Sequence, residues 1–485
     1  MGRYLFFVLL LTYTSPLMAQ NVNTDFQSFR KGMIESYNGF RQSVLDSYAK
    51  YLQEVWKEYE EFRGVKRDNT PKPIVEPRLA KQPDSPKLLP EPSASPNIVL
   101  PVDHMKPTAP KGLDTPMSPS TCVGVDVPFY CMTIKIASCK PCTISQIDNS
   151  EIAKAWKRYN DDATMGSVVQ SLETSVKEYG LSDWFTFVLV KNYGDKMTGN
   201  ALGSVVLQHF LLVSMGYDVR IASTSTQLLL LVPFKQQVYE RSYIVIEGKK
   251  YYAFYDSASQ MKINYGNRIY TCELPNNGAT GRNLDLTIKD SRLGIRSHES
   301  HTFHVSDGTL SLNGAVDKGL LEALRHYPQM DVPYYAMSCV DSDFHRDLLE
   351  QMKMQISGLS QIEAIKRLLH FVQHAFDYAT DEEQHGYEKP YFIEENFYYP
   401  KNDCEDRAIL FAFFVRKVLG ADVHLVHYPG HECTAVAFPD SSMSGDGYVF
   451  KGKTFYICDP TYIGAGVGQC MPTFKNVKPL VEQWY

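Results

Sequence analysis

Three residue types that can together activate a nucleophile follow one another near the C-terminus of the chain. Cys404 stands in NDCEDRA, His431 in GHECTAV and Asp459 in YICDPTYIG, at intervals of about 27 residues. A thiolate attacks a carbonyl, a histidine can take the thiol proton, and a carboxylate can orient the imidazole. The residue types and their order therefore predict a nucleophilic site, provided that the fold brings the three side chains together.

The residues around Cys404 predict a buried helix with the thiol in its first turn. The segment 408–419 is almost wholly apolar and ends before Gly420. A helix N-terminus lowers a thiol pKa, and its unpaired N–H groups can stabilise an oxyanion. Glu405 and Asp406 oppose that lowering, and we assign them a structural role in capping the helix.

The segments on either side of this helix predict the sheet that positions the other two residues. SQIEAIKRLLHFVQHAF has helical spacing, whereas DVHLVHY, HECTAVAF, GYVF and TFYICD read as strands separated by turn residues. His431 begins one strand and Asp459 ends another, so on neighbouring antiparallel strands both can face the helix that begins at Cys404. We expect an α+β fold in which a buried helix packs on an antiparallel sheet.

Other polar and aromatic residues of this region have less specific readings. Cys433 and Cys458 are expected in the core, and His424 and His427 are expected to be structural. An aromatic run precedes the nucleophile and is equally compatible with a cleft wall and with core packing; it comprises Tyr387, Tyr391, Phe392, Phe397, Tyr398 and Tyr399.

An internal repeat indicates that the module is duplicated. VDVPFYCM at 125–132 recurs as MDVPYYAM at 330–337, and NALGSVVLQHFLLVSMGYDVRIA at 200–222 resembles CEDRAILFAFFVRKVLGADVHLV at 404–426. EGKKYYAFYD at 247–256 resembles KGKTFYICD at 451–459. The offset is about 204 residues in each case, which predicts two tandem globular modules.

The first copy lacks two of the three candidate catalytic residues. The counterparts of Cys404 and His431 are Asn200 and Gln227, and only Asp256 retains the carboxylate. An amide neither attacks a carbonyl nor relays a proton. We therefore expect the first module to be inactive and to serve packing or substrate binding.

The three motifs of the second copy resemble the transglutaminase-like superfamily, whose core is papain-like. The resemblance implies that Cys404 is the nucleophile, that His431 is the general base and then the acid, and that Asp459 fixes the imidazole tautomer. It also implies cysteine thioester chemistry on polypeptides by a peptidase, a deamidase or a cross-linking enzyme. The aromatic oxyanion partner of the animal cross-linking enzymes has no clear counterpart, and neither a cofactor nor a metal is expected because no EF-hand spacing or second CxxC occurs.

The N-terminal quarter of the chain predicts export and a spacer. YLFFVLLL and the small residue Ala19 before Gln20 are typical of a signal peptide over residues 1–19. Aromatic and apolar residues at steps of three and four predict an amphipathic helical segment over residues 20–64, which could pack on its own protein or, through residues 24–64, on a partner or a second copy. Thirteen prolines between Thr70 and Ser120 predict a Pro-rich linker over residues 65–120.

These features define the expected domain organisation and surroundings. We expect an inactive module over 121–285, a connecting segment over 286–326 and a catalytic module over 327–485. The formal charge of −6 argues against nucleic acid as a partner, and the apolar run in the signal peptide is too short to remain in a membrane. The mature protein is expected in the periplasm, outside the cell or at the cell surface.

The ten cysteines do not form a disulfide-dense framework for a chain of 485 residues. Cys139 and Cys142 form a CxxC that predicts a local disulfide or an ordinary pair of thiols. For the whole chain the expectation is an exported cysteine-nucleophile hydrolase that attacks peptide or side-chain amide bonds. The alternatives are a protein transglutaminase or deamidase, and a non-enzymatic peptide-binding scaffold that retains a relic triad.

Overall fold

The computed structural model describes residues 124–482, together with residues 31, 32 and 39. Within 124–482 the gaps are residues 225, 240–242, 255–269, 273, 275, 277, 279, 290–292 and 439–443. Most of the predicted N-terminal segments therefore lie outside the described residues, namely the signal peptide, the amphipathic segment apart from three helical positions, and the linker. Among the described helices, none is both long enough and apolar enough to cross a bilayer.

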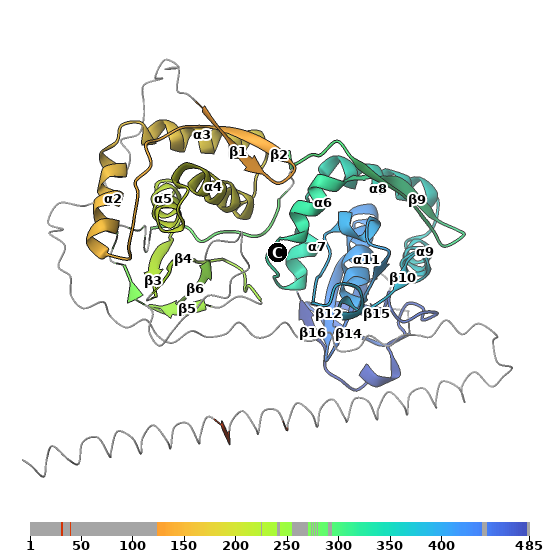
Figure 1. Cartoon of the computed structure of the whole chain (residues 1–485). Coiled ribbons are helices and arrows are strands. Elements are labelled where there is room, and N and C mark those ends of the chain that lie inside the picture. The colour runs from red at the N-terminus through yellow and green to blue at the C-terminus, as the bar shows by residue number, and fades with distance from the viewer. Residues whose placement is uncertain are drawn as a thin grey trace, which may run out of the picture. The chain divides into compact units, whose positions relative to one another are not determined.

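The first half of the described chain places helices on one face of a five-stranded antiparallel sheet (Figure 1). A hairpin, β1 and β2, precedes four helices, of which α5 contacts β3 and β4 of the sheet. The elements are β1 (Gly124–Phe129), β2 (Met132–Ala137), α2 (Asn149–Asp161), α3 (Met165–Glu178), α4 (Asp183–Thr198), α5 (Ala201–Ser214), β3 (Arg220–Ser223), β4 (Leu228–Val232), β5 (Tyr243–Ile246), β6 (Lys249–Phe254) and β7 (Tyr270–Thr271).

A hairpin and a short helix connect the two halves and pack on the second. They are β8 (Ser300–Ser306), β9 (Ser311–Asp317) and α6 (Lys318–Arg325). Phe303 of β8 lies against Phe344 and Phe397, with ring centroids 6.0 and 4.6 Å apart. The hairpin thus forms part of the aromatic core of the second half.

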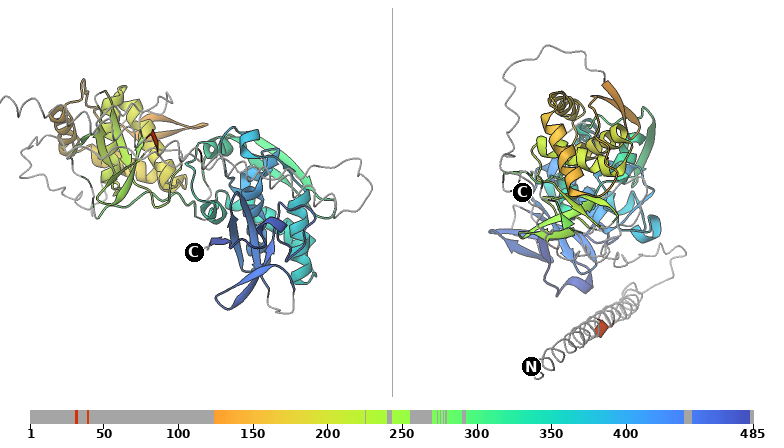
Figure 2. Two further views of the ribbon diagram at one scale, coloured as in Figure 1. Left: turned by 90° about the horizontal axis from the view of Figure 1, so that it is seen from below. Right: turned by 60° about the vertical axis from the view of Figure 1, so that its left-hand side comes forward.

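The second half again packs a buried helix, α11, on an antiparallel sheet, as Figure 2 shows from two further sides. Its helical elements are α7 (Val332–Met337), α8 (Ser342–Gln355), α9 (Gln361–His374), α10 (Asp381–Gln384), η2 (Ile393–Phe397), α11 (Cys404–Leu419) and η3 (Pro472–Phe474). Its strands are β10 (Asp377–Tyr378), β11 (Lys401–Asn402), β12 (Val423–Tyr428), β13 (His431–Ala437), β14 (Gly447–Phe450), β15 (Lys453–Cys458) and β16 (Leu480–Glu482). The expected α+β class and the four expected strands are confirmed.

The two sheets have the same strand order. It is β5-β6-β4-β3-β7 in the first half and β14-β15-β13-β12-β16 in the second. The first two strands of each sheet are joined by a two-residue turn with positive φ at both positions, Glu247-Gly248 and Lys451-Gly452. Such turns match the twist of the strands that they join, and glycine adopts the second position without strain.

The similar segments VDVPFYCM and MDVPYYAM differ in structure, which corrects one part of the predicted repeat. The first forms strand β1 and the turn to β2, whereas the second forms helix α7. Pro333 lies in the first turn of α7, where a proline costs no hydrogen bond. Pro128 lies opposite Thr133 in a two-stranded hairpin. Both settings accept the proline, so this local sequence does not decide between strand and helix.

Most of helix α11 is buried because residues 408–415 are apolar on every face. All residues from Cys404 to Val415 are buried, and the helix contacts α7, α8, α9, β12 and β13. Gly420 ends it with φ of 63°, a left-handed conformation that favours glycine. Packing on all sides therefore fixes the position of Cys404 relative to the sheet.

Candidate functional site

His431 and Asp459 form a buried pair on neighbouring strands. Strands β13 and β15 are antiparallel, His431 begins β13, and Asp459 directly follows β15. The imidazole Nε2 lies 2.8 Å from Asp459 Oδ2, and the two residues are 2% and 1% exposed. Because a carboxylate only accepts hydrogen bonds, Nε2 carries the proton and the lone pair of Nδ1 remains available. The predicted base and the predicted acid are therefore together in the structure.

The loop after β15 holds Asp459 in place. Its Oδ1 accepts hydrogen bonds from the backbone N–H groups of Thr461, at 2.9 Å, and Tyr462, at 3.0 Å. Gln373 of α9 donates from Nε2 to the carbonyl oxygens of Asp459, Tyr462 and Ala465. Both oxygens of the carboxylate are thus occupied, which leaves Asp459 little freedom to turn away from His431.

An aromatic ring covers the imidazole. Phe474 of η3 stacks on His431 with ring centroids 5.4 Å apart and planes 5° apart, and it also stacks on Tyr428. Phe474 is itself buried. A ring in this position shields the His431–Asp459 hydrogen bond from water and so strengthens it. No sequence pattern marks this contact, because Phe474 lies 15 residues beyond Asp459, after the last predicted strand.

Cys404 begins α11, as predicted, and lies beside the start of β13. The thiol accepts a hydrogen bond from the backbone N–H of Glu432, the residue after His431. Its own hydrogen is donated to Glu405 Oε2, with Sγ and the oxygen 3.1 Å apart. His431 Nδ1 has no hydrogen-bond partner among the described residues. The thiol therefore adjoins the His431-Glu432 peptide, but its hydrogen bond goes to a carboxylate and not to the imidazole.

The expected lowering of the thiol pKa is wrong for this arrangement. Burial raises the pKa of Cys404 well above its usual range, and the Glu405 and Asp403 carboxylates raise it further, whereas the N–H of Glu432 lowers it. Cys404 is 8% exposed. The sequence argument treated the helix N-terminus as solvated, but three acidic side chains are folded in around it.

Asp406 has the structural role that the sequence predicts, whereas Glu405 contacts the thiol. Asp406 accepts hydrogen bonds from the backbone N–H of Asp403, at 3.2 Å, and of Tyr391, at 2.8 Å. It thereby caps the helix and anchors the preceding segment. Glu405 caps nothing and is turned toward Cys404, so the expectation of a capping role holds for only one of the two residues.

Tyr378 is a residue near the thiol that the sequence analysis did not single out. It pairs with Asn402 across the short parallel ladder of β10 and β11. Its hydroxyl is buried and has no hydrogen-bond partner among the described residues. Burial raises the Tyr378 pKa well above its usual range, and the charges of Cys404, Asp403 and Glu405 raise it further. A protonated hydroxyl next to the thiol is a hydrogen-bond donor that no protein group uses.

The aromatic run before the nucleophile belongs mainly to the core. Tyr391, Phe392 and Phe397 are each at most 3% exposed, and Tyr391 stacks on Tyr399 at 4.9 Å. Tyr387 is the exception at 37% exposed. For the buried residues of this run, core packing is therefore confirmed, and the alternative prediction of a cleft wall is not.

Cys433 and Cys458 lie in the core, as expected, and His424 and His427 contact neighbouring side chains. Cys433 and Cys458 are buried, and Cys458 belongs to the main core. His424 stacks on Phe455 at 3.9 Å, and His427 Nδ1 lies 3.0 Å from Glu432 Oε2. Cys433 lies on the same side as the His431–Asp459 pair, since its sulfur is within 4.8 Å of the ligand atoms of both residues. None of the described cysteines forms a disulfide, Cys139 and Cys142 included.

The two described counterparts in the first half, Asn200 and Gln227, are amides. Asn200 precedes α5 and caps it, because its side chain accepts a hydrogen bond from the N–H of Gly203 at 2.9 Å. Gln227 precedes β4 and is buried. Asp256 lies outside the described residues. Asn200 thus occupies the cap of its helix, whereas Cys404 is the first residue of α11 and follows the cap Asp403.

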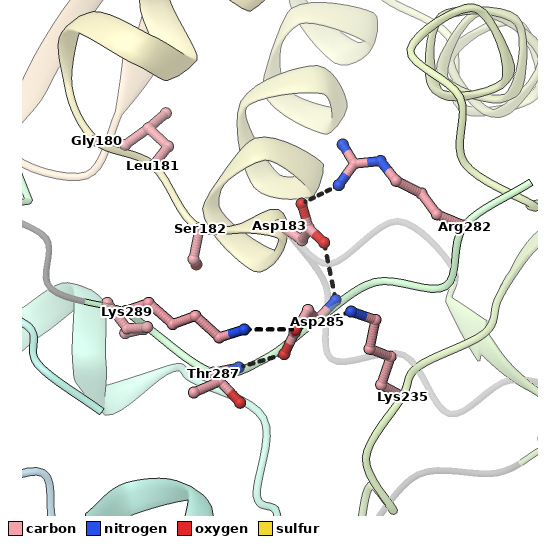
Figure 3. Close-up of a pocket in the computed structure, with 10 residues that line it drawn as sticks. Gly180, Leu181, Ser182, Asp183, Lys235, Arg282, Asp285, Thr287 and Lys289 are labelled. Carbon is pink, nitrogen blue, oxygen red and sulfur yellow. Dashed lines mark hydrogen bonds and ion pairs between the residues drawn. The ribbon is translucent and has the colours of Figure 1, made fainter. Parts of the chain in front are cut away.

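A cavity of about 310 Å³ lies in the first half, away from these positions (Figure 3). Lys235 and Lys289 approach Asp285 with N–O distances of 3.0 and 3.9 Å, and Arg282 pairs with Asp183 at 2.9 Å. Three basic side chains therefore line the cavity with two acidic ones, and each of the three lies within ion-pair distance of Asp183 or Asp285.

Comparisons with family models, curated proteins and solved structures found no match to the chain.

Proposed function

We propose that the chain is a cysteine-nucleophile enzyme that attacks peptide or side-chain amide bonds through a thioester at Cys404, with water as the acceptor. The observation that carries this proposal is the buried His431–Asp459 hydrogen bond, which leaves His431 Nδ1 without a partner, beside a helix that begins with a cysteine. The resemblance of the three motifs to the transglutaminase-like superfamily supports the same assignment.

In the proposed reaction, substrate binding turns the thiol from Glu405 to His431 Nδ1. The imidazole takes the thiol proton while the sulfur attacks the carbonyl carbon, and Asp459 stabilises the imidazolium. The imidazolium then protonates the leaving amine as the C–N bond breaks, which produces the thioester. Water, deprotonated by the same imidazole, cleaves the thioester and releases the acid and the free thiol.

The oxyanion formed during both steps needs donors close to the thiol. The backbone N–H groups of the first turn of α11 are one source. We propose the Tyr378 hydroxyl as the side-chain donor, because it is buried, has no hydrogen-bond partner among the described residues and lies close enough to Cys404 for the charge of the thiolate to act on it. This fills the position that the sequence resemblance left unassigned.

The test is a comparison of the full chain with its Cys404→Ala variant on a proteome-derived peptide and protein mixture that contains a labelled primary amine. New chain termini, or ammonia released without incorporation of the amine, with the wild type alone supports the hydrolase. Incorporation of the amine without new termini assigns the protein to the cross-linking alternative. Identical products from wild type and variant contradict the proposal and favour a non-enzymatic scaffold.

A further inference from the structure

Two histidines lie one turn apart on the exposed face of α9. His370 and His374 are both exposed, whereas Gln373 beside them is buried and faces the loop that holds Asp459. The two imidazole rings stack, with centroids 4.0 Å apart and planes 21° apart. Among the described residues, no other two histidines are four residues apart on one helix. This spacing places both imidazoles on the same side of α9, where one ligand can contact both.

The hydrogen bonds of the two rings fix which nitrogen carries the proton. His370 Nδ1 lies 2.6 Å from Oδ2 of Asp307, in the turn between β8 and β9, and His374 Nδ1 lies 2.8 Å from the carbonyl oxygen of His370. A carboxylate and a carbonyl only accept hydrogen bonds, so each Nδ1 is protonated. In a neutral imidazole the lone pair then belongs to Nε2. Neither Nε2 atom has a hydrogen-bond partner among the described residues.

The partner of His370 is itself held in place. The Asp307 side chain is 0% exposed, and its Oδ1 accepts hydrogen bonds from the backbone N–H groups of Thr309, at 2.8 Å, and Leu310, at 2.7 Å. A metal-bound imidazole usually donates its other N–H to a carboxylate or a backbone carbonyl, which orients the ring and makes the ligating nitrogen more basic. Both histidines already have this arrangement, one with each type of acceptor.

We propose that His370 and His374 form a binding site for a divalent transition-metal ion of the nickel, copper and zinc class, through their two Nε2 atoms. Imidazole is a preferred ligand of these ions, whereas calcium and magnesium prefer oxygen. Two histidines at this helical spacing also bind zinc in metalloproteases. The χ2 torsion of histidine is broad, so the stacked rings can turn toward one ion, and water completes its coordination. The proposal does not depend on the function of Cys404.

The first experiment tests whether the exposed pair binds a metal ion that is held on a surface. The full chain, without an affinity tag, is applied to an immobilised Ni²⁺-chelate column, which retains a protein through side chains that are accessible from outside. We expect the wild type to elute at an imidazole concentration at least threefold higher than either His370→Gln or His374→Gln. Buried cysteines and carboxylates cannot contribute to this retention.

His326→Gln is the matched control. His326 is exposed at the end of α6, and its Nδ1 lies 3.1 Å from the carbonyl oxygen of Glu322, the residue four positions earlier. Its hydrogen bond is thus the same as that of His374, but no second imidazole lies one turn away. The His326→Gln variant should therefore elute with the wild type.

The second experiment tests binding of the free ion in solution. Urea unfolding of each protein is measured with and without Ni²⁺, because a ligand that binds only the folded chain raises the urea midpoint. The midpoint should rise for the wild type and for His326→Gln, and it should stay unchanged for His370→Gln and His374→Gln. Each protein is compared with itself, so loss of the Asp307 hydrogen bond does not affect the comparison.

A rebuilt pair separates metal binding from a purely structural role. The double variant Lys366→His/His374→Gln places two histidines one turn earlier on the same helix, at the exposed positions 366 and 370. It should recover both the column retention and the rise in the urea midpoint. Equal retention of the wild type and both single variants, an equal Ni²⁺-dependent rise in those variants, or no recovery in the rebuilt pair would each overturn the proposal. The Asp307–His370 hydrogen bond would then serve only to attach the β8–β9 hairpin to α9.

Discussion

At the scale of the residue, the chemistry depends on which partner the Cys404 thiol has. The structure pairs His431 with Asp459 and places the thiol beside the backbone of Glu432, but the thiol donates to Glu405. A thiol in this state is a poor nucleophile, since its raised pKa disfavours the thiolate. The proposed enzyme therefore requires the substrate, or a change at Glu405, to transfer the thiol to His431.

The Tyr378 hydroxyl provides a residue-scale prediction. Tyr378→Phe removes one oxyanion donor while keeping the ring, so kcat should fall roughly 100-fold with little change in KM. Steady-state kinetics on a substrate identified as above measure this. Tyr193→Phe removes a buried hydroxyl that donates to the carbonyl of Ala137 in the first half, and it should leave kcat unchanged. A Tyr378→Phe variant with wild-type kcat would remove Tyr378 from the mechanism.

At the scale of the element, α11 and the sheet position the side chains of the candidate site. A buried ion pair between α8 and η2 attaches the segment that precedes α11. The Nε2 atom of His345 in α8 is 3.0 Å from the Oε1 atom of Glu394 in η2. Both residues are buried. Burial lowers the His345 pKa, but the Glu394 charge outweighs it, and the resulting pKa is about 10. This pair ties a surface helix to the segment that leads into the candidate site.

The pH dependence of this ion pair follows from the sign of the shift. The folded pKa of about 10 lies above the value of about 6.5 expected for the unfolded chain, so the stabilisation is complete below pH ~6.5 and is lost as the pH rises toward 10. His345→Gln should lower the free energy of unfolding by about 3 kcal/mol at pH 6, and that difference should shrink at pH 10. Urea unfolding at both pH values measures it.

The exposed pair of His326 and Glu322 provides the control for that experiment. His326→Gln should change stability by less than ~0.5 kcal/mol at either pH, because exposed ion pairs contribute little. A His345→Gln effect that is the same at pH 6 and pH 10 would show that the histidine is uncharged in the folded protein.

The elements were more predictable than the contacts between them. Helices α9 and α11 and strands β12 to β15 follow from apolar spacing, and the pairing of His431 with Asp459 follows from strand order. The Glu405 contact to the thiol and the Phe474 ring over His431 depend on packing between segments far apart in the sequence. Local patterns contain no information on such packing. For the same reason the similar sequences at 125–132 and 330–337 were predicted to have the same structure, although the first is a strand and the second a helix.

At the scale of the whole molecule, the two halves share a strand order but not the residues of the site. Asn200 caps α5 through its hydrogen bond to Gly203 N–H, a role that accounts for an asparagine at this position without any catalytic function. The first half is thus expected to contribute stability, and the activity of the full chain should depend on the second half alone.

Substitution of Asn200 tests this division of roles. Asn200→Ala in the full chain should lower the free energy of unfolding by about 1 kcal/mol, because the cap is lost, and should leave kcat/KM unchanged. Asn200→Asp restores a capping oxygen and should recover the stability. The measurements are thermal unfolding and steady-state kinetics, and a fall in kcat/KM for both variants at full folding would mean that the first half takes part in catalysis.

The central claim is that Cys404 and His431 act together, and the rate of thiol alkylation tests it without knowledge of the substrate. The Glu405→Gln variant, which removes the carboxylate that holds the thiol, and the Glu405→Gln/His431→Asn double variant are treated with iodoacetamide at pH 7 and the modified peptides are quantified over time, with the exposed Cys131 as the internal reference. The account predicts that Cys404 reacts faster than Cys433 in Glu405→Gln and at least tenfold more slowly in the double variant, with Cys131 unchanged. Equal Cys404 rates in the two proteins, or faster reaction of Cys433, would contradict it.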